Sequence, residues 1–423
     1  MSQAAPPSAR FALPGAELCV HCGFCLEACP TYLALDDEND SPRGRVVLMK
    51  ALATGAMSLD DADAQRHIDR CLGCRACETA CPSGVPYGHL LETTRAVLTA
   101  RRPLPAIARA ILFVFARPAL LGLTLWGARI ARATRVPALL GRFGGAAGFA
   151  MAMLASTRRR SRATPYAIRN RSGARPHGTV AAFRGCVMEG LFTDANRATE
   201  RTLAVNGYVL TDAPGQRCCG ALHAHAGDAR AARELAMRNI AAFEAGGSQW
   251  IAVNSAGCGA MMKEYGHLLA DDPTWHDRAA AFSARVRDVS ELLVAAGPVR
   301  GAPLKGRATY DAPCHLQHGQ RVVTPPLALL GAIPELDLLP LTDADQCCGS
   351  AGIYNLIEPA LSDQVLAPKL AHIAATGATL VVTGNPGCLM QIAQHCRAQG
   401  VDVEVAHPVS LLARALDESR YQP

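Results

Sequence analysis

The chain has 423 residues, of which 50% are apolar and 18% are charged. This length suits two or three domains with a sizeable core, and the composition excludes a disordered chain. The 17 cysteines are the unusual feature, and we expect no secretory signal because the first ten residues contain no apolar stretch. Cysteines that stay in a reducing compartment argue against a disulfide scaffold and for metal or redox chemistry.

Eight cysteines form two runs with the spacing C-x2-C-x2-C-x3-C-P, and the second run repeats the first after 52 positions. Three thiolates at two-residue gaps can hold three corners of one iron–sulfur cube, while the fourth, fixed by proline, points to the other cube. Zinc also binds C-x2-C pairs, but the doubled run with proline is far more typical of iron–sulfur proteins. We therefore predict two [4Fe–4S] clusters with crossed ligands: Cys19, Cys22, Cys25 and Cys81 for cluster 1, and Cys71, Cys74, Cys77 and Cys29 for cluster 2.

The segment between the two runs is predicted to be helical, over 41–53 and 60–69, with a proline at the start of the first helix. Residues 1–100 are therefore expected to form a mostly helical ferredoxin domain. Positive charge near the clusters would favour their reduced form and raise their potentials, although any one arginine could equally be a solvated surface charge. The candidates are Arg43, Arg45, Arg70 and Arg75.

Residues 101–185 contain sixteen arginines, no lysine and no acidic residue. Because the whole chain has a net charge of +6, the rest of the chain has a net charge of −10. Apolar clusters alternate here with single arginines, which predicts a basic connector of short amphipathic helices over 101–175, with an exposed linker from 157 onward. No apolar stretch reaches the about 20 residues that a spanning helix needs. The helices could lie on an anionic membrane, dock on an acidic partner, or pack on their own domain. Nucleic acid is disfavoured because no recognition motif accompanies the arginines.

Eight further cysteines form a second repeat, with offsets of 128 to 130 positions. Buried strands are predicted over 179–183, 250–253, 308–310 and 379–383, and each leads into a turn and a cysteine. Helical patterns lie between them, so we expect two α/β units with parallel sheets, over 176–300 and 301–423. The thiols would gather beyond the carboxyl ends of the strands as a redox or cluster site. They are Cys186, Cys218, Cys219 and Cys258 in the first unit, and Cys314, Cys347, Cys348 and Cys388 in the second.

The predicted fold class is thus α+β and multidomain: a helical two-cluster ferredoxin domain followed by two Cys-Cys-Gly α/β units. The remaining cysteine, Cys396, lies in a helical stretch and is expected to be a small buried hydrophobe. No Gly-x-Gly-x-x-Gly follows a strand, so we expect no flavin or nicotinamide on this chain.

Short motifs along the chain carry a family resemblance. They are Cys-Val-His-Cys-Gly-Phe-Cys (19–25), Cys-Pro-Thr-Tyr (29–32), Pro-Arg-Gly-Arg (42–45), Asp-Arg-Cys-Leu (69–72), Cys-Pro-Ser-Gly-Val (81–85), Arg-Pro-Leu-Pro (102–105), Gly-Cys-Gly-Ala (257–260), Lys-Glu-Tyr-Gly (263–266) and Cys-Cys-Gly-Ser-Ala-Gly (347–352). Together they resemble the iron–sulfur subunit of bacterial glycolate oxidase, also called glycolate dehydrogenase. The resemblance covers nearly the whole chain and is weakest over 106–178.

The resemblance implies an oxidoreductase complex in which this chain is not catalytic alone. A partner subunit with FAD takes the hydride from glycolate and yields glyoxylate, a second flavoprotein-like subunit accompanies it, and this chain carries electrons towards the respiratory chain. A pair of cubes suits the splitting of a hydride into single electrons. The resemblance also implies a cytoplasmic protein, peripheral on the inner face of the cell membrane.

Two other functions remain open at this point: a heterodisulfide-reductase-like thiol–disulfide reductase, and the iron–sulfur subunit of anaerobic glycerol-3-phosphate dehydrogenase. A zinc-stabilised scaffold is a third. Heterodisulfide-type units carry a further cysteine three positions after Cys258 or Cys388, where this chain has Met261 and Gln391. Neither side chain can replace a thiolate, so each unit is expected to hold at most one four-cysteine cluster or a thiol site.

Overall fold

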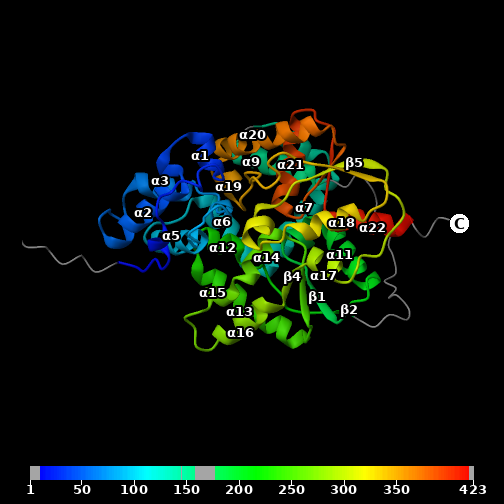
Figure 1. Ribbon diagram of the computed structural model, residues 1–423, viewed down its shortest axis with the longest axis horizontal. Helices are drawn as coiled ribbons and strands as arrows, with labels where there is room; N and C mark the ends of the chain where they lie inside the picture. The colour runs from blue at the N-terminus through cyan, green and yellow to red at the C-terminus, as the bar shows by residue number, and fades with distance from the viewer. Residues whose placement is uncertain (1–9, 144, 158–176, 419–423) are drawn as a thin grey trace, which may run out of the picture.

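The computed structural model describes residues 10–143, 145–157 and 177–418. Figure 1 shows a helical N-terminal part beside two α/β units, with a further group of helices packed on them. Thr157, the first residue of the linker predicted to be exposed, is buried, and the rest of that linker, to residue 175, lies outside the described residues.

The N-terminal part is helical, as its sequence predicts. The helix expected over 41–53 is α2 (Pro42–Thr54), and its start is capped by the Ser41 hydroxyl, which accepts a hydrogen bond from the Gly44 amide at 3.0 Å. The helix expected over 60–69 is α3 (Ala62–Asp69), capped by Asp61. The other helices of this part are α1 (Pro30–Leu35), α4 (Ala76–Thr79) and α5 (Tyr87–Arg101), with the short turns η1 (Ala16–Leu18) and η2 (Glu38–Asp40).

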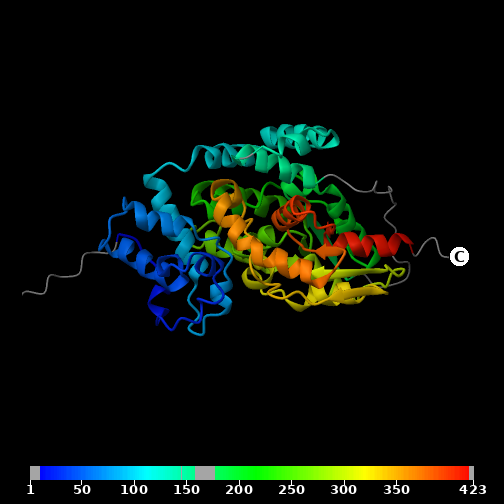
Figure 2. The same cartoon turned by 90° about the horizontal axis from the view of Figure 1, so that it is seen from above.

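Up to residue 157, the described part of the basic connector forms four helices, which we call the arm. They are α6 (Ala106–Phe115), α7 (Pro118–Ala133), α8 (Val136–Leu140) and α9 (Gly145–Ser156). Pro118 and Pro137 stand in the first turns of α7 and α8, where a missing amide hydrogen costs nothing. Within the described residues no single helix has the length and apolarity to cross a membrane. The pair α6 and α7 passes that test only together, bent by 105°. Figure 2 shows the arm along one side of the molecule, away from the blue N-terminal segment.

The first α/β unit is built on a four-stranded parallel sheet in the order β2-β1-β3-β4. Its strands are β1 (Thr179–Phe183), β2 (Val209–Thr211), β3 (Trp250–Val253) and β4 (Val286–Asp288). The predictions over 179–183 and 250–253 are confirmed. The helices are α10 (Val187–Leu191), α11 (Thr193–Val205), α12 (Ala221–His225), α13 (Ala229–Gly246), α14 (Ala256–Lys263), α15 (Tyr265–Leu268), α16 (His276–Arg285) and α17 (Val289–Ala295).

The second unit repeats this topology in the order β6-β5-β7-β8, again all parallel. Its strands are β5 (Gly306–Tyr310), β6 (Leu336–Leu339), β7 (Leu380–Val382) and β8 (Glu404–Ala406), so the strands predicted over 308–310 and 379–383 are present. Its helices are α18 (Thr324–Gly331), α19 (Tyr354–Ile357), α20 (Pro359–Thr376), α21 (Pro386–Ala398) and α22 (Pro408–Glu418), and a π-helical turn, η3 (His315–Gly319), follows Cys314.

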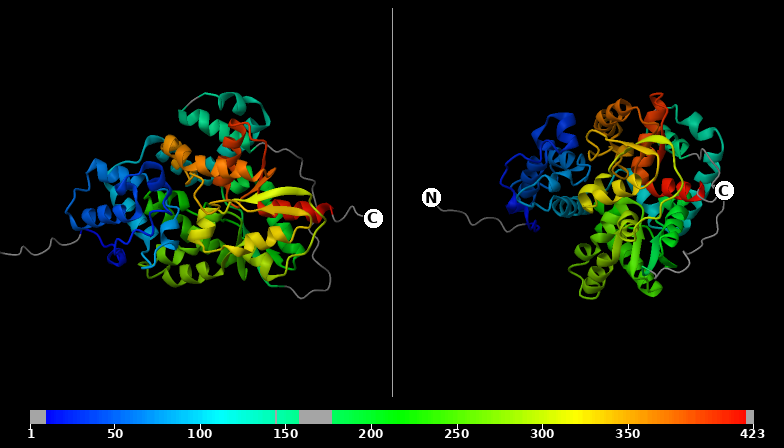
Figure 3. Two further views of the ribbon diagram at one scale, coloured as in Figure 1. Left: turned by 45° about the horizontal axis from the view of Figure 1, so that its top comes forward. Right: turned by 45° about the vertical axis from the view of Figure 1, so that its right-hand side comes forward.

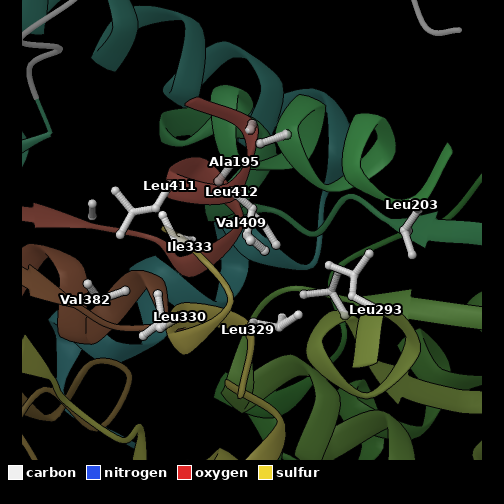
Figure 4. Packing of buried hydrophobic residues seen from close by; sticks show 14 of the residues in the cluster. Ala195, Leu203, Leu293, Leu329, Leu330, Ile333, Val382, Val409, Leu411 and Leu412 are labelled. Atoms are coloured by element: carbon white, nitrogen blue, oxygen red, sulfur yellow. The ribbon is translucent and has the colours of Figure 1, made fainter. Parts of the chain in front are cut away.

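The two units share one hydrophobic core. Leu203 and Leu293 of the first unit belong to the same buried cluster as Leu329, Val382 and Leu412 of the second, as Figure 4 shows. Helix α11 packs on α22, and α17 packs on α18. The views in Figure 3 show the green first unit and the yellow-to-red second unit in close contact. This packing fixes the two repeats relative to each other, and it therefore also fixes the sites at their strand ends.

Candidate iron–sulfur and thiol centres

The first cysteine group surrounds a cavity at the surface of the N-terminal part. Cys19, Cys22, Cys25 and Cys81 all line it, together with Arg43 and other neighbours. The loop that carries three of them turns sharply because His21 and Gly23 have φ of 56° and 89°, in the left-handed region. Cys22 is exposed and the other three are half-buried. Cys81, the fourth cysteine of the second run, therefore lies beside the first three cysteines of the first run.

The second cysteine group lines an adjacent cavity that lies deeper in the protein. Cys71, Cys74, Cys77 and Cys29 surround it, and all four are buried. Cys77 also borders the first cavity, so the two sites are neighbours. The structure thus brings together the same two crossed quartets that the sequence predicts.

The chemistry of these thiols fits a bound metal cluster. Burial raises the pKa of Cys74 and Cys77 well above the usual value, and negative charge on nearby thiolates adds to this. Burial also opposes ionisation of Cys71, but the net pKa is lowered by the charges of Arg45 and Arg95 and by hydrogen bonds from the Tyr87 hydroxyl and the Gly73 amide. Four thiolates gathered in a buried site need cationic charge to balance them, and a [4Fe–4S] core supplies it.

A buried ionic network beside the second group was only partly visible in the sequence. The Arg45 guanidinium is fully buried and donates to the His67 carbonyl at 2.7 Å, the Thr31 hydroxyl at 2.9 Å and the Asp40 carboxylate at 2.9 Å. The Thr31 hydroxyl lies 3.3 Å from the Cys29 Sγ. Of the four candidate arginines, Arg45 and Arg75 both border the cavity of the second group, and Arg45 is the fully buried one.

The other three candidate arginines lie in less buried ion pairs. Arg43 pairs with Glu38 at 2.6 Å, and Arg70 reaches Asp40 at 3.2 Å. Arg75 pairs with both Glu78 and Glu264, which ties the N-terminal part to the first α/β unit. Two further residues, Tyr87 and Arg95, also act on Cys71. No motif in the sequence could have identified them.

The thiols of the first α/β unit meet beyond the carboxyl ends of β1 and β3, as predicted for a parallel sheet. The Cys186 Sγ lies 3.7 Å from the Cys218 Sγ, and the neighbouring thiols of Cys218 and Cys258, together with burial, raise the pKa of Cys219 well above its usual value. Cys218 and Cys219 are buried, and the other two are half-buried. All four thiols therefore form one compact group.

The second unit repeats this arrangement with all four thiols buried. The Sγ atoms of Cys314 and Cys347 are 3.8 Å apart, and those of Cys348 and Cys388 are 3.1 Å apart. The His315 Nδ1 lies 3.5 Å from the Cys314 Sγ. This histidine was not singled out from the sequence, because a single histidine next to a cysteine is a weak signal.

The positions where a fifth cysteine would stand contain no thiol. Met261 is buried among apolar neighbours of the first unit. The Gln391 amide is fully buried: its nitrogen donates to the Ser362 hydroxyl at 3.0 Å, and its oxygen accepts from the Asn355 amide at 2.9 Å. The extra cysteine, Cys396, is 2% exposed in α21, and burial raises its pKa to about 11, so it is the buried hydrophobe that the sequence predicts.

The four thiol groups are connected through packed elements, and we call this series of contacts the row. Cys74 of the second group shares one buried cluster with Cys314 and Cys347 of the second α/β unit. Helix α14, which carries Cys258, packs against η3, which directly follows Cys314. Contacts therefore lead from group 1 to group 2, from group 2 to the second unit, and from the second unit to the first unit.

Comparisons with known proteins match both halves of the chain. A 4Fe-4S dicluster domain matches residues 15–85, and a Cysteine-rich domain matches twice, over 180–263 and 308–393. A crystal structure of a hypothetical protein from Helicobacter pylori aligns with a TM-score of 0.55 at 9% identity, covering 96% of this chain and 73% of that one, which supports the fold alone.

Curated relatives extend over almost the full length. The probable glycolate oxidase iron-sulfur subunit of Bacillus subtilis (strain 168) is 37% identical, covering 94% of this chain and 93% of its own, and the glycolate oxidase iron-sulfur subunit of Escherichia coli (strain K12) is 33% identical, covering 95% and 94%. Lactate utilization protein A of Shouchella clausii is 31% identical over 55% of this chain and 98% of its own length. The dicluster domain and the paired cysteine-rich domains make this an iron–sulfur electron-transfer protein. With two relatives above 30% identity along nearly all of both chains, it belongs to the family of glycolate oxidase iron–sulfur subunits.

Proposed function

We propose that this chain is the electron-transfer subunit of a complex that oxidises glycolate to glyoxylate. That oxidation removes two electrons and two protons. A flavin on the partner subunit accepts the hydride, and the electrons then pass singly to this chain while the protons return to water. The observation that supports this most is the continuous row of four thiol groups, which begins at the surface with Cys22 and leads inward. The names of the relatives supply the substrate and the need for a flavoprotein partner.

In this proposal the eight N-terminal thiolates are the cluster ligands, in the crossed assignment. Arg45, Arg95 and the Tyr87 hydroxyl place positive charge and a hydrogen bond at cluster 2, which favours its reduced form. Cluster 1 has fewer such groups and lies nearer solvent. We infer that electrons move from cluster 1 to cluster 2.

Each Cys-Cys-Gly unit is proposed to hold at most one four-cysteine cluster or a thiol site. The Met261 and Gln391 positions support this, since both are occupied by packed or hydrogen-bonded side chains without a thiol. For the same reason the disulfide-reductase alternative is not favoured. The proposal gives each part of the chain one role. Residues 1–100 hold clusters 1 and 2, residues 101–175 contain the arm, and residues 176–300 and 301–423 form the two Cys-Cys-Gly units.

The decisive experiment is anaerobic mixing of the purified chain with its flavoprotein partner. Glycolate should bleach the visible cluster absorbance only when the flavoprotein is present, because the isolated chain has no hydride acceptor. The same preparation should contain about eight irons from the two cubes and at most about four more for each α/β unit. Turnover of glycolate by the chain alone, or an iron content well above about sixteen per chain, would contradict the proposal.

We further propose that the arm makes peripheral contact with the inner face of the cell membrane. Its surface combines exposed arginines with exposed apolar side chains, and this combination suits an anionic bilayer. The exposed apolar residues include Leu120, Leu123, Trp126, Ile130, Leu139, Leu140 and Phe143.

Two arginines of the arm bind backbone carbonyls of the first α/β unit. The Arg129 Nε donates to the Gly190 carbonyl at 2.7 Å, and an Arg132 nitrogen donates to the Leu191 carbonyl at 2.7 Å. These bonds anchor α7 on α10 of the first unit, and the two helices pack against each other. Substituting these two arginines would therefore loosen the arm itself. A test of membrane attraction has to use other arginines.

We expect Arg109→Gln, Arg135→Gln and Arg142→Gln together to release the protein from anionic lipid vesicles at lower salt than the wild type. These three residues are exposed, and attraction between exposed charges weakens as salt shortens the screening length. Vesicle co-sedimentation across a salt series measures the effect. The matched control replaces three exposed arginines of the α/β units, Arg230, Arg238 and Arg300, by glutamine. Equal salt profiles for both triple variants would show that net charge matters and the arm does not.

A further inference from the structure

A cluster of exposed apolar side chains surrounds the first cysteine group. We call this surface the cluster 1 face. It consists of Leu18, Val20, Phe24 and Val47, which are 44%, 69%, 68% and 50% exposed. Val20 and Phe24 stand between the cysteines of the loop from residue 19 to 25 and border the same cavity, yet most of each side chain remains in solvent. Single exposed apolar residues are ordinary, but four around one redox site indicate a binding surface.

The centre of the cluster 1 face carries no charge. The loop from 19 to 25 contains no lysine, arginine, aspartate or glutamate. Beside it, Arg43 and Glu38 neutralise each other in an ion pair of 2.6 Å, while the exposed Glu17 and Glu27 flank the loop at the rim of the face. Val47 follows Arg43 by one helical turn on α2, so it extends the same surface. An apolar core with depleted charge is typical of a stable protein–protein interface.

The position of this face limits what can cover it. Any protein that buries Phe24 and Val20 comes into contact with the loop that carries Cys22, the one exposed thiol among the described cysteines. The described thiols of the other three groups are buried or half-buried. An electron carrier bound here would therefore face the outermost redox site, at the start of the row. A partner without a redox group would block this site from every donor.

The other large set of exposed apolar residues belongs to the arm and has different chemistry. There the apolar side chains stand in a segment that contains arginines and no acidic residue, which favours lipid over protein. Figure 2 shows that the arm and the blue N-terminal segment lie in different regions of the molecule. Donor and membrane can therefore bind at the same time without competing for one surface.

We propose that the flavin-bearing subunit docks on the cluster 1 face, burying Phe24 and Val20, and delivers single electrons to cluster 1. This rests on the proposed function, because it needs a flavoprotein donor. In each transfer the reduced flavin loses one electron and cluster 1 gains it. Cluster 1 then passes the electron inward to cluster 2, so it is ready to accept the second.

The test uses the full chain with its clusters and the flavoprotein partner. Phe24→Glu should weaken the complex at least about tenfold in Kd, because it places an unpaired carboxylate in the apolar centre of the interface. Glycolate-driven reduction of the clusters should slow in parallel, whereas chemical reduction by dithionite should be unchanged. Val47→Glu, on α2 and outside the ligand loop, provides a second variant that keeps the test open if Phe24→Glu lowers the iron content.

The matched control introduces the same charge at an exposed apolar site on the second α/β unit. Val323 and Leu327 are 43% and 42% exposed, and Val323→Glu and Leu327→Glu should leave the complex intact. Wild-type affinity of Val47→Glu and of a cluster-loaded Phe24→Glu would overturn the docking proposal. Failure of the wild-type chain to bind or accept electrons from the flavoprotein would instead overturn the proposed function, so the two failures are distinguishable.

Discussion

Replacing Cys29 by serine is expected to abolish cluster 2 and leave cluster 1 in place, although Cys29 belongs in sequence to the first cysteine run. Replacing Cys81 should do the reverse. The physical reason is that Cys29 lines the cavity of Cys71, Cys74 and Cys77, while Cys81 lines the cavity of the first run. A cube that loses one of its four thiolates loses a corner ligand, and serine is a poor replacement for it.

Paramagnetic spectra of the reduced variants, with iron and sulfide analysis, measure this effect. Each variant should lose about four irons, and the remaining spectrum should belong to a different cluster in each case. Cys396→Ser is the control, because this buried cysteine packs in one apolar cluster with Cys348 and Cys388 of the second unit, and its replacement should leave the iron of clusters 1 and 2 unchanged. If each variant perturbs only the cluster of its own run, the crossed assignment is wrong.

Replacing Asp40 by alanine is expected to destabilise the N-terminal part by about 3–5 kcal/mol. Asp40 is fully buried, and its carboxylate pairs with Arg45 at 2.9 Å, Arg70 at 3.2 Å and His67 at 3.1 Å. Removing it takes away the carboxylate that hydrogen-bonds to the buried Arg45 guanidinium, and breaking a buried pair in this way costs far more than the pair itself contributes. The midpoint of urea-induced loss of cluster absorbance, under anaerobic conditions, reports the change.

A surface ion pair of the same chemistry provides the control. Asp63 pairs with Arg66 at 2.8 Å, but both side chains are half or more exposed, so Asp63→Ala should cost no more than about 1 kcal/mol. Similar urea midpoints for the two variants would show that the buried network around Arg45 is not what holds the N-terminal part together.

The structure decides between readings of the charge pattern that the sequence leaves open. The arginine-rich connector without an acidic residue could lie on a membrane, dock on a partner or pack on its own domain. Arg129 and Arg132 hold the arm on the first α/β unit through backbone carbonyls. A charge count cannot reveal this, because a carbonyl acceptor carries no signal in the sequence.

The sequence by itself determined whatever depends on local spacing. Three thiolates two residues apart define a ligand loop, and strands followed by a turn and a cysteine define a thiol site at a sheet edge, because both are set by a few neighbouring residues. The repeat offsets likewise showed two α/β units before any coordinates. Strand β1, over 179–183, matches its prediction at both ends.

Only the tertiary structure decided which distant groups meet. Arg43 and Arg45 are two residues apart on α2, yet one lies at the surface and the other is buried against cluster 2, because residues at that spacing do not share a helix face. Cys74 and Cys314 are far apart in the chain and share one buried cluster because the N-terminal part packs against the second unit. Such contacts arise from the packing of whole elements, which residue spacing does not encode, and they turn four separate thiol groups into one row.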